Sequence, residues 1–272
     1  MSLIMKNLTI ITEFVFMGLS RIPQIQTMLF ALFLVMYLLT LMGNLMVILV
    51  IRTDYHLKTP MYFFLGHLSF LDLSLSSVTM PKMLQNLLTQ KKTISTWACM
   101  TQSFFLMFSG TTESCLLSVM AYDRYAAICH PLLCSVVLNR PLCVGMVITA
   151  WGYLGKRWPK RIVLEEYKTP TDWSGALPGL RIISAILNIR SSEGQGKAFS
   201  TCSSHLTVVL LFYGTALFRY ISPASGSALE RVVSIQYSVI TSLLNPLIYS
   251  LKNQEVKAAL QRMLRQQTCA TG

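Results

Sequence analysis

Charged residues are scarce in this chain. Asp, Glu, Lys and Arg together make up 12% of the 272 residues, whereas a soluble globular domain carries about 25%. Hydrophobic residues account for 53% of the chain, and the mean hydropathy is +0.52. Such a composition, combined with long apolar runs, indicates a polytopic membrane protein rather than a soluble domain.

Motifs of metal, redox and nucleotide chemistry are also missing. No two of the seven cysteines form C-x-x-C, which argues against a zinc ribbon or a thioredoxin-type site. The four histidines form no H-E-x-x-H, and there is no glycine-rich phosphate loop. The start, Met-Ser-Leu-Ile-Met-Lys, lacks the pattern of a cleaved signal peptide, so we expect the first spanning helix to direct the chain to the membrane. The sequence therefore offers no recognisable metal, redox or phosphate-binding motif.

The chain is strongly basic, with 23 Lys and Arg residues against 11 Asp and Glu residues and a net charge of +12. An excess of this size is one signature of nucleic-acid binding. In a membrane protein it is better explained by basic residues in the loops that stay in the cytosol. We therefore expect membrane lipid, and no nucleic acid, among the partners.

Five apolar runs are long enough to cross a bilayer, which takes about 20 helical residues. They are residues 28–51, 61–80, 98–121, 199–221 and 231–251. Pro60 suits the first turn of the second helix, and we expect Pro81 to close that helix. Pro246 is expected to kink the last one. Residues 252–265 predict a short amphipathic helix on the membrane surface, with a solvated tail as the alternative.

Residues 136–198 interrupt this pattern. The apolar stretches 142–154 and 179–189 hold only 13 and 11 residues, and the basic, polar segment between them could not be satisfied in lipid. If the first stretch crossed and 156–181 lay outside, thirteen of the 23 basic residues would be outside, against seven if neither crosses. Because basic residues favour the cytosolic side, we predict five firm spans and a basic cytoplasmic or interfacial insert.

Several separated motifs carry a family resemblance. They are Gly43-Asn44, Pro60-Met-Tyr-Phe-Phe-Leu65, Leu68-Ser-Phe-Leu-Asp-Leu73, Met120-Ala-Tyr-Asp-Arg-Tyr-Ala-Ala-Ile-Cys-His-Pro-Leu132, Lys197-Ala-Phe-Ser-Thr-Cys-Ser-Ser-His-Leu206 and Asn245-Pro-Leu-Ile-Tyr-Ser-Leu251. In this order they resemble the olfactory (odorant) receptors, a branch of the rhodopsin-like G-protein-coupled receptors. The resemblance implies an all-α, polytopic transmembrane helix bundle at the cell membrane. Such a receptor binds a small volatile odorant and activates a stimulatory heterotrimeric G protein.

The chain departs from the family between Trp151 and Arg181. Members have seven helices and a long, cysteine-rich second extracellular loop, so the fourth and fifth spans are disrupted here. The expected organisation is an extracellular N-terminus at 1–27, a transmembrane receptor domain at 28–251 that is disrupted at 152–181, and a cytoplasmic tail at 252–272. The rival interpretation is a truncated, receptor-derived membrane protein that does not signal and is retained in the endoplasmic reticulum.

The resemblance assigns a switch for G-protein coupling to Asp123, Arg124 and Tyr125 at the inner end of the third helix. Arg124 would hold Asp123 at rest and release it on activation, while Tyr249 moves in from the last helix. The alternative is an arginine that merely extends to the polar edge of the membrane at a helix end.

Two carboxylates, Asp72 and Glu113, fall inside predicted spans, where buried charge is expensive and usually marks function. In the family the matching positions face each other near mid-membrane, beside Asn44 and Asn245. Two carboxylates that close would share a proton or hold a cation, since the ionised forms repel. The sequence leaves open a sodium site and a protonated, hydrogen-bonded structural pair.

The resemblance also places an odorant pocket among the third, fifth, sixth and last helices of the family fold. By position its lining would be Met107, Gly110, Thr111, Tyr213, Ala216 and Ser238. Mostly apolar side chains with a few hydroxyls suit small volatile ligands, and ordinary helix packing is the alternative. The missing helix-five wall puts this pocket in question.

Two residues concern the outer surface. Asn7 lies in an N-x-[ST] triplet and, if extracellular, would accept a glycan. Cys99 matches the family cysteine at the outer end of the third helix, whose partner normally lies in the second extracellular loop. No cysteine lies between Cys143 and Cys202, so that partner is absent and Cys99 is expected to be a free thiol.

Overall fold

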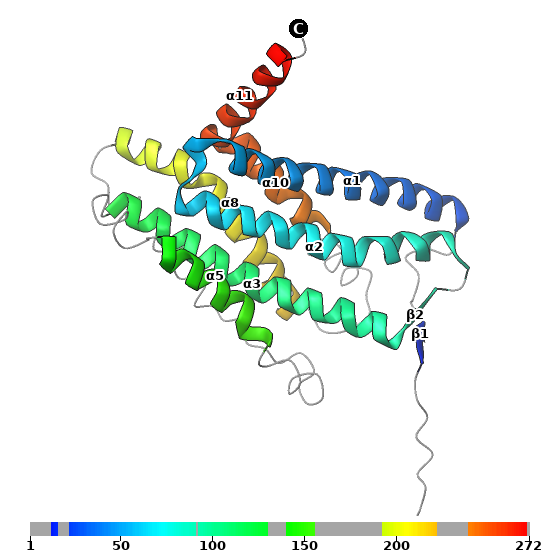
Figure 1. Cartoon of the computed structure of the whole chain (residues 1–272). Helices are drawn as coiled ribbons and strands as arrows, with labels where there is room; N and C mark the ends of the chain where they lie inside the picture. Colours follow the sequence, from blue (N-terminus) through cyan, green and yellow to red (C-terminus); the bar gives the residue numbers. More distant parts are fainter. Residues whose placement is uncertain are drawn as a thin grey trace, which may run out of the picture.

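The computed structural model describes residues 12–15, 22–90, 92–129, 140–155, 192–221 and 239–270. These residues form a bundle of α-helices with a two-stranded sheet at one end (Figure 1). Within this part of the chain, three helices are long and apolar enough to cross a membrane. The expectation of an all-α bundle that crosses the membrane several times is confirmed.

The first two helices form an antiparallel pair (Figure 1). α1 (Pro23–Thr53) and α2 (Pro60–Leu88) each have proline in the first turn, where its missing N–H leaves no helical bond unmade. The short 3₁₀ helix η1 (Tyr55–Leu57) turns the chain between them. The predicted span at 28–51 lies wholly inside α1.

Pro81 does not end α2, so that prediction is wrong. The helix continues to Leu88 with Pro81 inside it. An internal proline removes one helical hydrogen bond, but a neighbouring helix supplies a donor nearby. Gln102 Nε2 donates to the carbonyl of Val78, one turn before the proline, at 3.0 Å. The contact ties the two helices together where the backbone is interrupted.

A small sheet precedes the third helix and was not predicted. β1 (Glu13–Val15) pairs antiparallel with β2 (Thr93–Ser95), with Phe14 opposite Ile94. The Thr96 N–H donates to the Thr12 carbonyl at 3.0 Å and extends the pairing into α3 (Thr96–Cys129). The segment before α1 is thus attached to the start of α3.

The second half of the described chain contributes four more helices. They are α5 (Arg140–Gly155), α8 (Ser192–Ile221), α10 (Thr241–Lys252) and α11 (Gln254–Ala270). With 16 residues, α5 is shorter than a crossing helix requires, and the apolar stretch of α8 runs over Cys202–Thr215. The fifth predicted span enters the described part only at Val239, and the basic insert at 156–181 lies outside it. The number of crossings therefore stays a prediction.

The helices pack around one main apolar core. α2 contacts α1, α3 and α10, and α8 packs between α3 and α10. The main cluster draws on α2 (Leu65, Leu68), α3 (Leu117, Met120) and α8 (Val208), all of them buried. The outer face of α1 instead exposes large apolar side chains, including Met28, Leu32, Val35, Met42 and Leu49. An apolar outer face of this kind suits contact with lipid.

α11 leaves the bundle at the end opposite the sheet (Figure 1). Its apolar side docks partly on protein, because Val256 and Ala259 are buried in the main cluster and Leu260 and Met263 pack against it. The predicted amphipathic helix therefore exists, extended to Ala270. Part of its apolar face packs on the bundle and is therefore not available to a membrane surface. We call this the α11 end of the bundle, and the opposite one the sheet end.

Candidate functional site

An acid–base pair lies at the last turns of α3, at the α11 end. Arg124 donates to Asp123 Oδ2 twice, from Nε at 3.0 Å and from a terminal guanidinium nitrogen at 2.6 Å. The Asp123 side chain is 4% exposed and that of Arg124 is 19% exposed. Two charge-assisted bonds in so sheltered a place are stronger than an exposed surface pair. Tyr125 is half-buried against Ala121, Cys202 and Leu206.

Tyr249 of α10 is completely buried and lies within electrostatic range of Arg124. Its hydroxyl lies 3.4 Å from Nδ1 of His205 on α8, and the His205 side chain is also buried. The His205 Nε2 atom has no hydrogen-bond partner within the described residues. The geometry thus brings together three helices around the pair: α3, α8 and α10. No role was predicted for His205, although it is a polar residue inside one of the motifs.

Deeper in the bundle, Asp72, Glu113 and Asn245 contact one another, and Asn44 bonds α10 one turn before Asn245. Asn44, Asp72, Glu113 and Asn245 are all at most 4% exposed. Asn245 Nδ2 donates to Asp72 Oδ2 at 2.9 Å. Asn245 also interacts with the Glu113 side chain, and the two carboxylates, Asp72 and Glu113, are close enough to repel each other. Asn44 Nδ2 donates to the carbonyls of Thr40 and Ser242, both at 3.0 Å. These contacts join α1, α2, α3 and α10.

Some oxygen atoms of this cluster remain unsatisfied. Glu113 Oε1 and Asn44 Oδ1 are buried and have no hydrogen-bond partner among the residues that the structure describes. The hydroxyls of Ser109 and Thr112, on the same helix as Glu113, are likewise buried without a hydrogen-bond partner among the described residues. Buried polar atoms normally find a partner, so such a group calls for a proton, a water or an ion. Carboxylate, amide and hydroxyl oxygens are a donor set that suits a hard cation.

The expected odorant-lining residues differ in exposure within the described part of the chain. Met107 is 38% exposed, and Gly110 and Thr111 are half-buried. Tyr213 is buried, and its hydroxyl forms a 2.9 Å hydrogen bond with Ser114 that links α3 to α8. Ser238 and the side chain of Ala216 lie outside the described residues. Their role in ligand binding stays a prediction.

An open groove does exist at the sheet end, between α2 and α3. It is lined by Val78, Pro81, Lys82, Gln85, Ala98, Thr101 and Gln102. None of the expected odorant-lining residues belongs to this set. Lys82 is held by its neighbour, since Nζ donates to Gln85 Oε1 at 2.9 Å.

Of the two residues predicted at the outer surface, the structure describes only Cys99. Cys99 is a half-buried free thiol, and it lies near the start of α3 at the sheet end. Asn7 lies outside the described residues, so its glycosylation stays a prediction.

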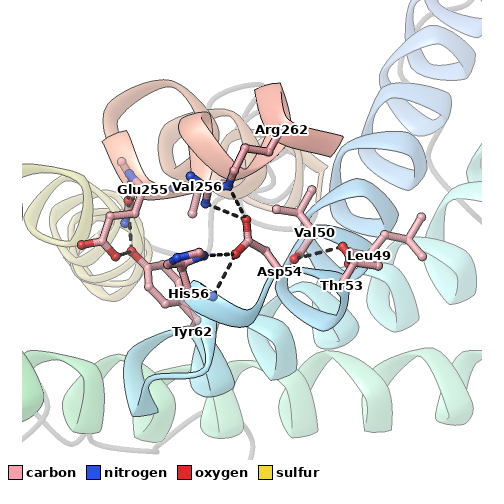
Figure 2. Close-up of polar contacts among 10 residues, drawn as sticks. Leu49, Val50, Thr53, Asp54, His56, Tyr62, Glu255, Val256 and Arg262 are labelled. Carbon is pink, nitrogen blue, oxygen red and sulfur yellow. Dashed lines mark hydrogen bonds and ion pairs between the residues drawn. The ribbon is translucent and has the colours of Figure 1, made fainter. Parts of the chain in front are cut away.

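The structure also reveals contacts at the α11 end that the sequence did not indicate (Figure 2). Tyr62 of α2 reaches Glu255 of α11, with 2.6 Å between the two oxygen atoms. Arg262 of α11 binds Asp54, which lies between α1 and η1, at 2.9 and 2.6 Å. The partners stand 193 and 208 residues apart in the chain, so no local pattern could have paired them.

Comparisons with known proteins agree on one family. A model of the rhodopsin-family seven-transmembrane receptors matches residues 43–154, and a model of the olfactory receptors matches residues 176–267. The chain is 46% identical to human olfactory receptor 8S1, over 95% of this chain and 83% of that protein. It is 41% identical to mouse olfactory receptor 1E16, over 95% and 96%, and 40% identical to human olfactory receptor 5AN1, over 97% and 98%.

The same comparisons bear on the middle of the chain. Neither family model covers residues 155–175. The alignment with the human 8S1 receptor runs over 300 positions, more than this chain has residues, so that relative carries residues that are missing here. The uncovered stretch lies within the region that the sequence marked as disrupted.

Proposed function

The chain belongs to the olfactory receptor family, and on that premise we propose that it binds a small volatile odorant and activates a stimulatory heterotrimeric G protein. The family consists of rhodopsin-type membrane receptors rather than enzymes, and the chain is accordingly a multi-pass membrane protein. The observation that carries the proposal is the sheltered Asp123–Arg124 pair beside the buried Tyr249.

The proposed coupling step is an exchange of partners by Arg124. At rest its guanidinium is held by the Asp123 carboxylate through two hydrogen bonds. Binding of an odorant would favour an arrangement in which this contact opens and Tyr249 moves toward the arginine, which frees the α11 end for the G protein. A ligand shifts such an equilibrium only by the difference in its affinity for the two states.

The buried cluster of Asn44, Asp72, Glu113 and Asn245 is proposed to hold a single sodium ion. The unpartnered oxygens of Glu113 and Asn44 support this assignment, since they provide acceptors that no protein donor uses. An ion there would relieve the repulsion between the two carboxylates and tie α2, α3 and α10 together. A carboxyl proton shared within the pair would do the same, so the two are distinguished by whether sodium raises the unfolding temperature of the protein in lipid nanodiscs.

For topology, we propose that 1–27 is extracellular, with a glycan on Asn7, and that 252–272 is cytoplasmic. The α11 end of the bundle then faces the cytosol. Glycan acceptors introduced within 156–170 test the side of the insert that the sequence assigned to the cytosol or the interface. Modification of these acceptors from the luminal side would contradict it.

A second candidate function is a receptor-derived chain that does not signal and stays in the endoplasmic reticulum. It is favoured by the region 155–175 that neither family model covers and by the exposure of Met107, an expected pocket residue. Neither observation touches the Asp123–Arg124 pair or Tyr249.

Surface labelling of an epitope-tagged chain separates the two candidates. For a signalling receptor we expect the chain at the surface and a rise in cyclic AMP on exposure to an odorant panel, with no rise for Arg124→Ala at equal surface density. Retention of the wild-type chain inside the cell, without a cyclic AMP response, would favour the second candidate and contradict the first.

A further inference from the structure

The junction between α10 and α11 is built around Asn253. Its backbone N–H donates to the Tyr249 carbonyl at 3.1 Å and so closes the end of α10. Its side-chain Oδ1 accepts from the N–H groups of Glu255 and Val256, at 3.1 and 3.3 Å, and so caps the start of α11. One residue therefore connects the helix that carries Tyr249 with the helix that follows it.

Tyr62 reaches this junction from α2, as Figure 2 shows for Glu255. Its hydroxyl donates to Glu255 Oε2 at 2.6 Å and lies 3.2 Å from Asn253 Oδ1. The tyrosine is 3% exposed, so its ring is fixed by packing while the hydroxyl meets the two acceptors. A short bond to a carboxylate is among the stronger neutral-donor hydrogen bonds in proteins.

The same tyrosine lies next to the coupling switch. Tyr62, Tyr249 and Val256 belong to one buried cluster. The Arg124 guanidinium is close enough to interact electrostatically with both tyrosine hydroxyls. Any movement of Tyr249 toward Arg124 would pull on the Asn253 N–H that it accepts from, and so on the contacts of Tyr62.

A second contact, between Asp54 and Arg262, holds α11 nearer its C-terminus. The effect of losing the Tyr62 contact can therefore be measured without detaching the whole helix. Arg262 binds Asp54 Oδ2, and the His56 N–H donates to Asp54 Oδ1 at 2.9 Å (Figure 2). Burial by itself would raise the pKa of Asp54, but the hydrogen bonds from Arg262 and His56 outweigh it and hold the pKa below its ordinary value. This anchor lies two turns beyond the junction, so it can keep α11 attached when the junction loosens.

We propose that Tyr62 is a positioning residue of the coupling switch. Its hydroxyl fastens the α10–α11 junction to α2 and so keeps Tyr249 in its buried, resting place. The consequence of this contact for signalling rests on the proposed receptor function, whereas the contact itself is present in the structure. Loss of the hydroxyl frees the junction while the packing of the ring and the Asp54–Arg262 anchor remain.

Hydrogen–deuterium exchange on the full chain in lipid nanodiscs tests the proposal, with Tyr62→Phe as the main variant. We expect the amides of Asn253, Glu255 and Val256 to exchange roughly tenfold faster, which corresponds to about 1.4 kcal/mol, with no change in the rest of the bundle. Tyr37→Phe is the matched control, because Tyr37 is a half-buried tyrosine of α1 in a separate apolar cluster. Glu255→Ala should reproduce the effect, and combining it with Tyr62→Phe should add little.

The outcomes are distinct. Unchanged exchange at the junction, or an equal rise across all helices in Tyr62→Phe and Tyr37→Phe, would overturn the positioning role. In cells, a higher ligand-independent cyclic AMP level for Tyr62→Phe than for the wild type would confirm that the hold restrains the switch. If the wild-type chain couples to no G protein, the proposed function fails while the exchange result still decides whether Tyr62 holds the junction.

Discussion

The two ends of the bundle are held together by different kinds of contact. At the α11 end, polar side chains from distant parts of the chain bind one another, as in Asp123–Arg124, Tyr62–Glu255 and Asp54–Arg262. At the sheet end, the described residues meet through a three-residue strand pairing, the Gln102–Val78 contact and an apolar cluster that includes Phe33, Leu84 and Leu87, while Trp97 stays 81% exposed. The described residues of the α11 end thus specify its arrangement through side-chain pairs that join distant parts of the chain.

The largest expected effect comes from breaking the pair at the α11 end. Arg124→Ala leaves the Asp123 carboxylate, 4% exposed, without its guanidinium. Removing one partner of a buried pair costs about 3 kcal/mol, because the remaining charge is poorly solvated. We expect a clear fall in the unfolding temperature of the detergent-solubilised protein, measured by thiol-reactive or intrinsic fluorescence.

Arg124→Lys is the companion variant, since it keeps the charge but loses the two-point contact. It should recover part of the lost stability. Equal stability of Arg124→Ala and the wild type would mean that the pair contributes nothing to holding the α11 end.

The next largest loss of stability is expected from Gly43→Ala in the middle of the bundle. A Cβ at Gly43 would lie 3.1 Å from Pro246 Cγ, so α1 and α10 would have to move apart by a few tenths of an ångström. Overpacking of this kind costs about 1–2 kcal/mol. Gly66→Ala in α2 is the control, because nothing lies within 4 Å of its Cβ position, and it should be neutral or slightly stabilising.

Thermal unfolding of the two alanine variants, side by side, measures the difference. A Gly43→Ala protein as stable as Gly66→Ala would show that the close approach of α1 and α10 is absent in the membrane.

A smaller, pH-dependent effect is expected at Asp54. Its pKa is depressed in the folded protein, so its contribution is present at neutral pH and is lost as the pH falls through and below its ordinary value of 3.8. Because the Arg262 side chain is 46% exposed, the contribution is below about 1 kcal/mol. The stability difference between wild type and Asp54→Asn should be measurable at pH 6 and shrink toward pH 3. A difference that grows on acidification would contradict this sign.

The smallest effect is predicted at the sheet end. Trp97→Ala removes a large side chain that is already 81% exposed, so the unfolding free energy of the isolated chain should change by less than about 0.5 kcal/mol. A loss comparable to that of Gly43→Ala would show that the sheet end is packed more tightly than its exposure indicates, and the contrast between the two ends would fail.

The helical spans were accessible from the sequence because an apolar run of membrane length has few other interpretations. Residues 28–51 and 98–121 lie inside α1 and α3. Asp72, Glu113 and Asn245 meet as the family resemblance implied, and Asn44 bonds the Ser242 carbonyl one turn away. The predicted end of α2 at Pro81 is wrong because α2 continues through the proline to Leu88. Gln102 of α3 makes a tertiary hydrogen bond to Val78, one turn before the proline.

Other features were not predicted from the sequence. Strands of three residues show no periodicity, so the pairing of Phe14 with Ile94 could not be predicted. The contacts of Tyr62 and Asp54 join residues about two hundred positions apart, and only the folded bundle brings them together. His205 and Tyr62 both lie inside quoted motifs, where a polar side chain among apolar ones was a signal that could have been followed.

The most direct test of the coupling function is nucleotide exchange on a purified stimulatory G protein by the full chain in lipid nanodiscs. We expect the wild-type chain to accelerate GDP release, Tyr62→Phe to accelerate it further without ligand, and Arg124→Ala to abolish the acceleration. A folded wild-type chain that leaves the release rate at the value of the G protein alone would contradict the account.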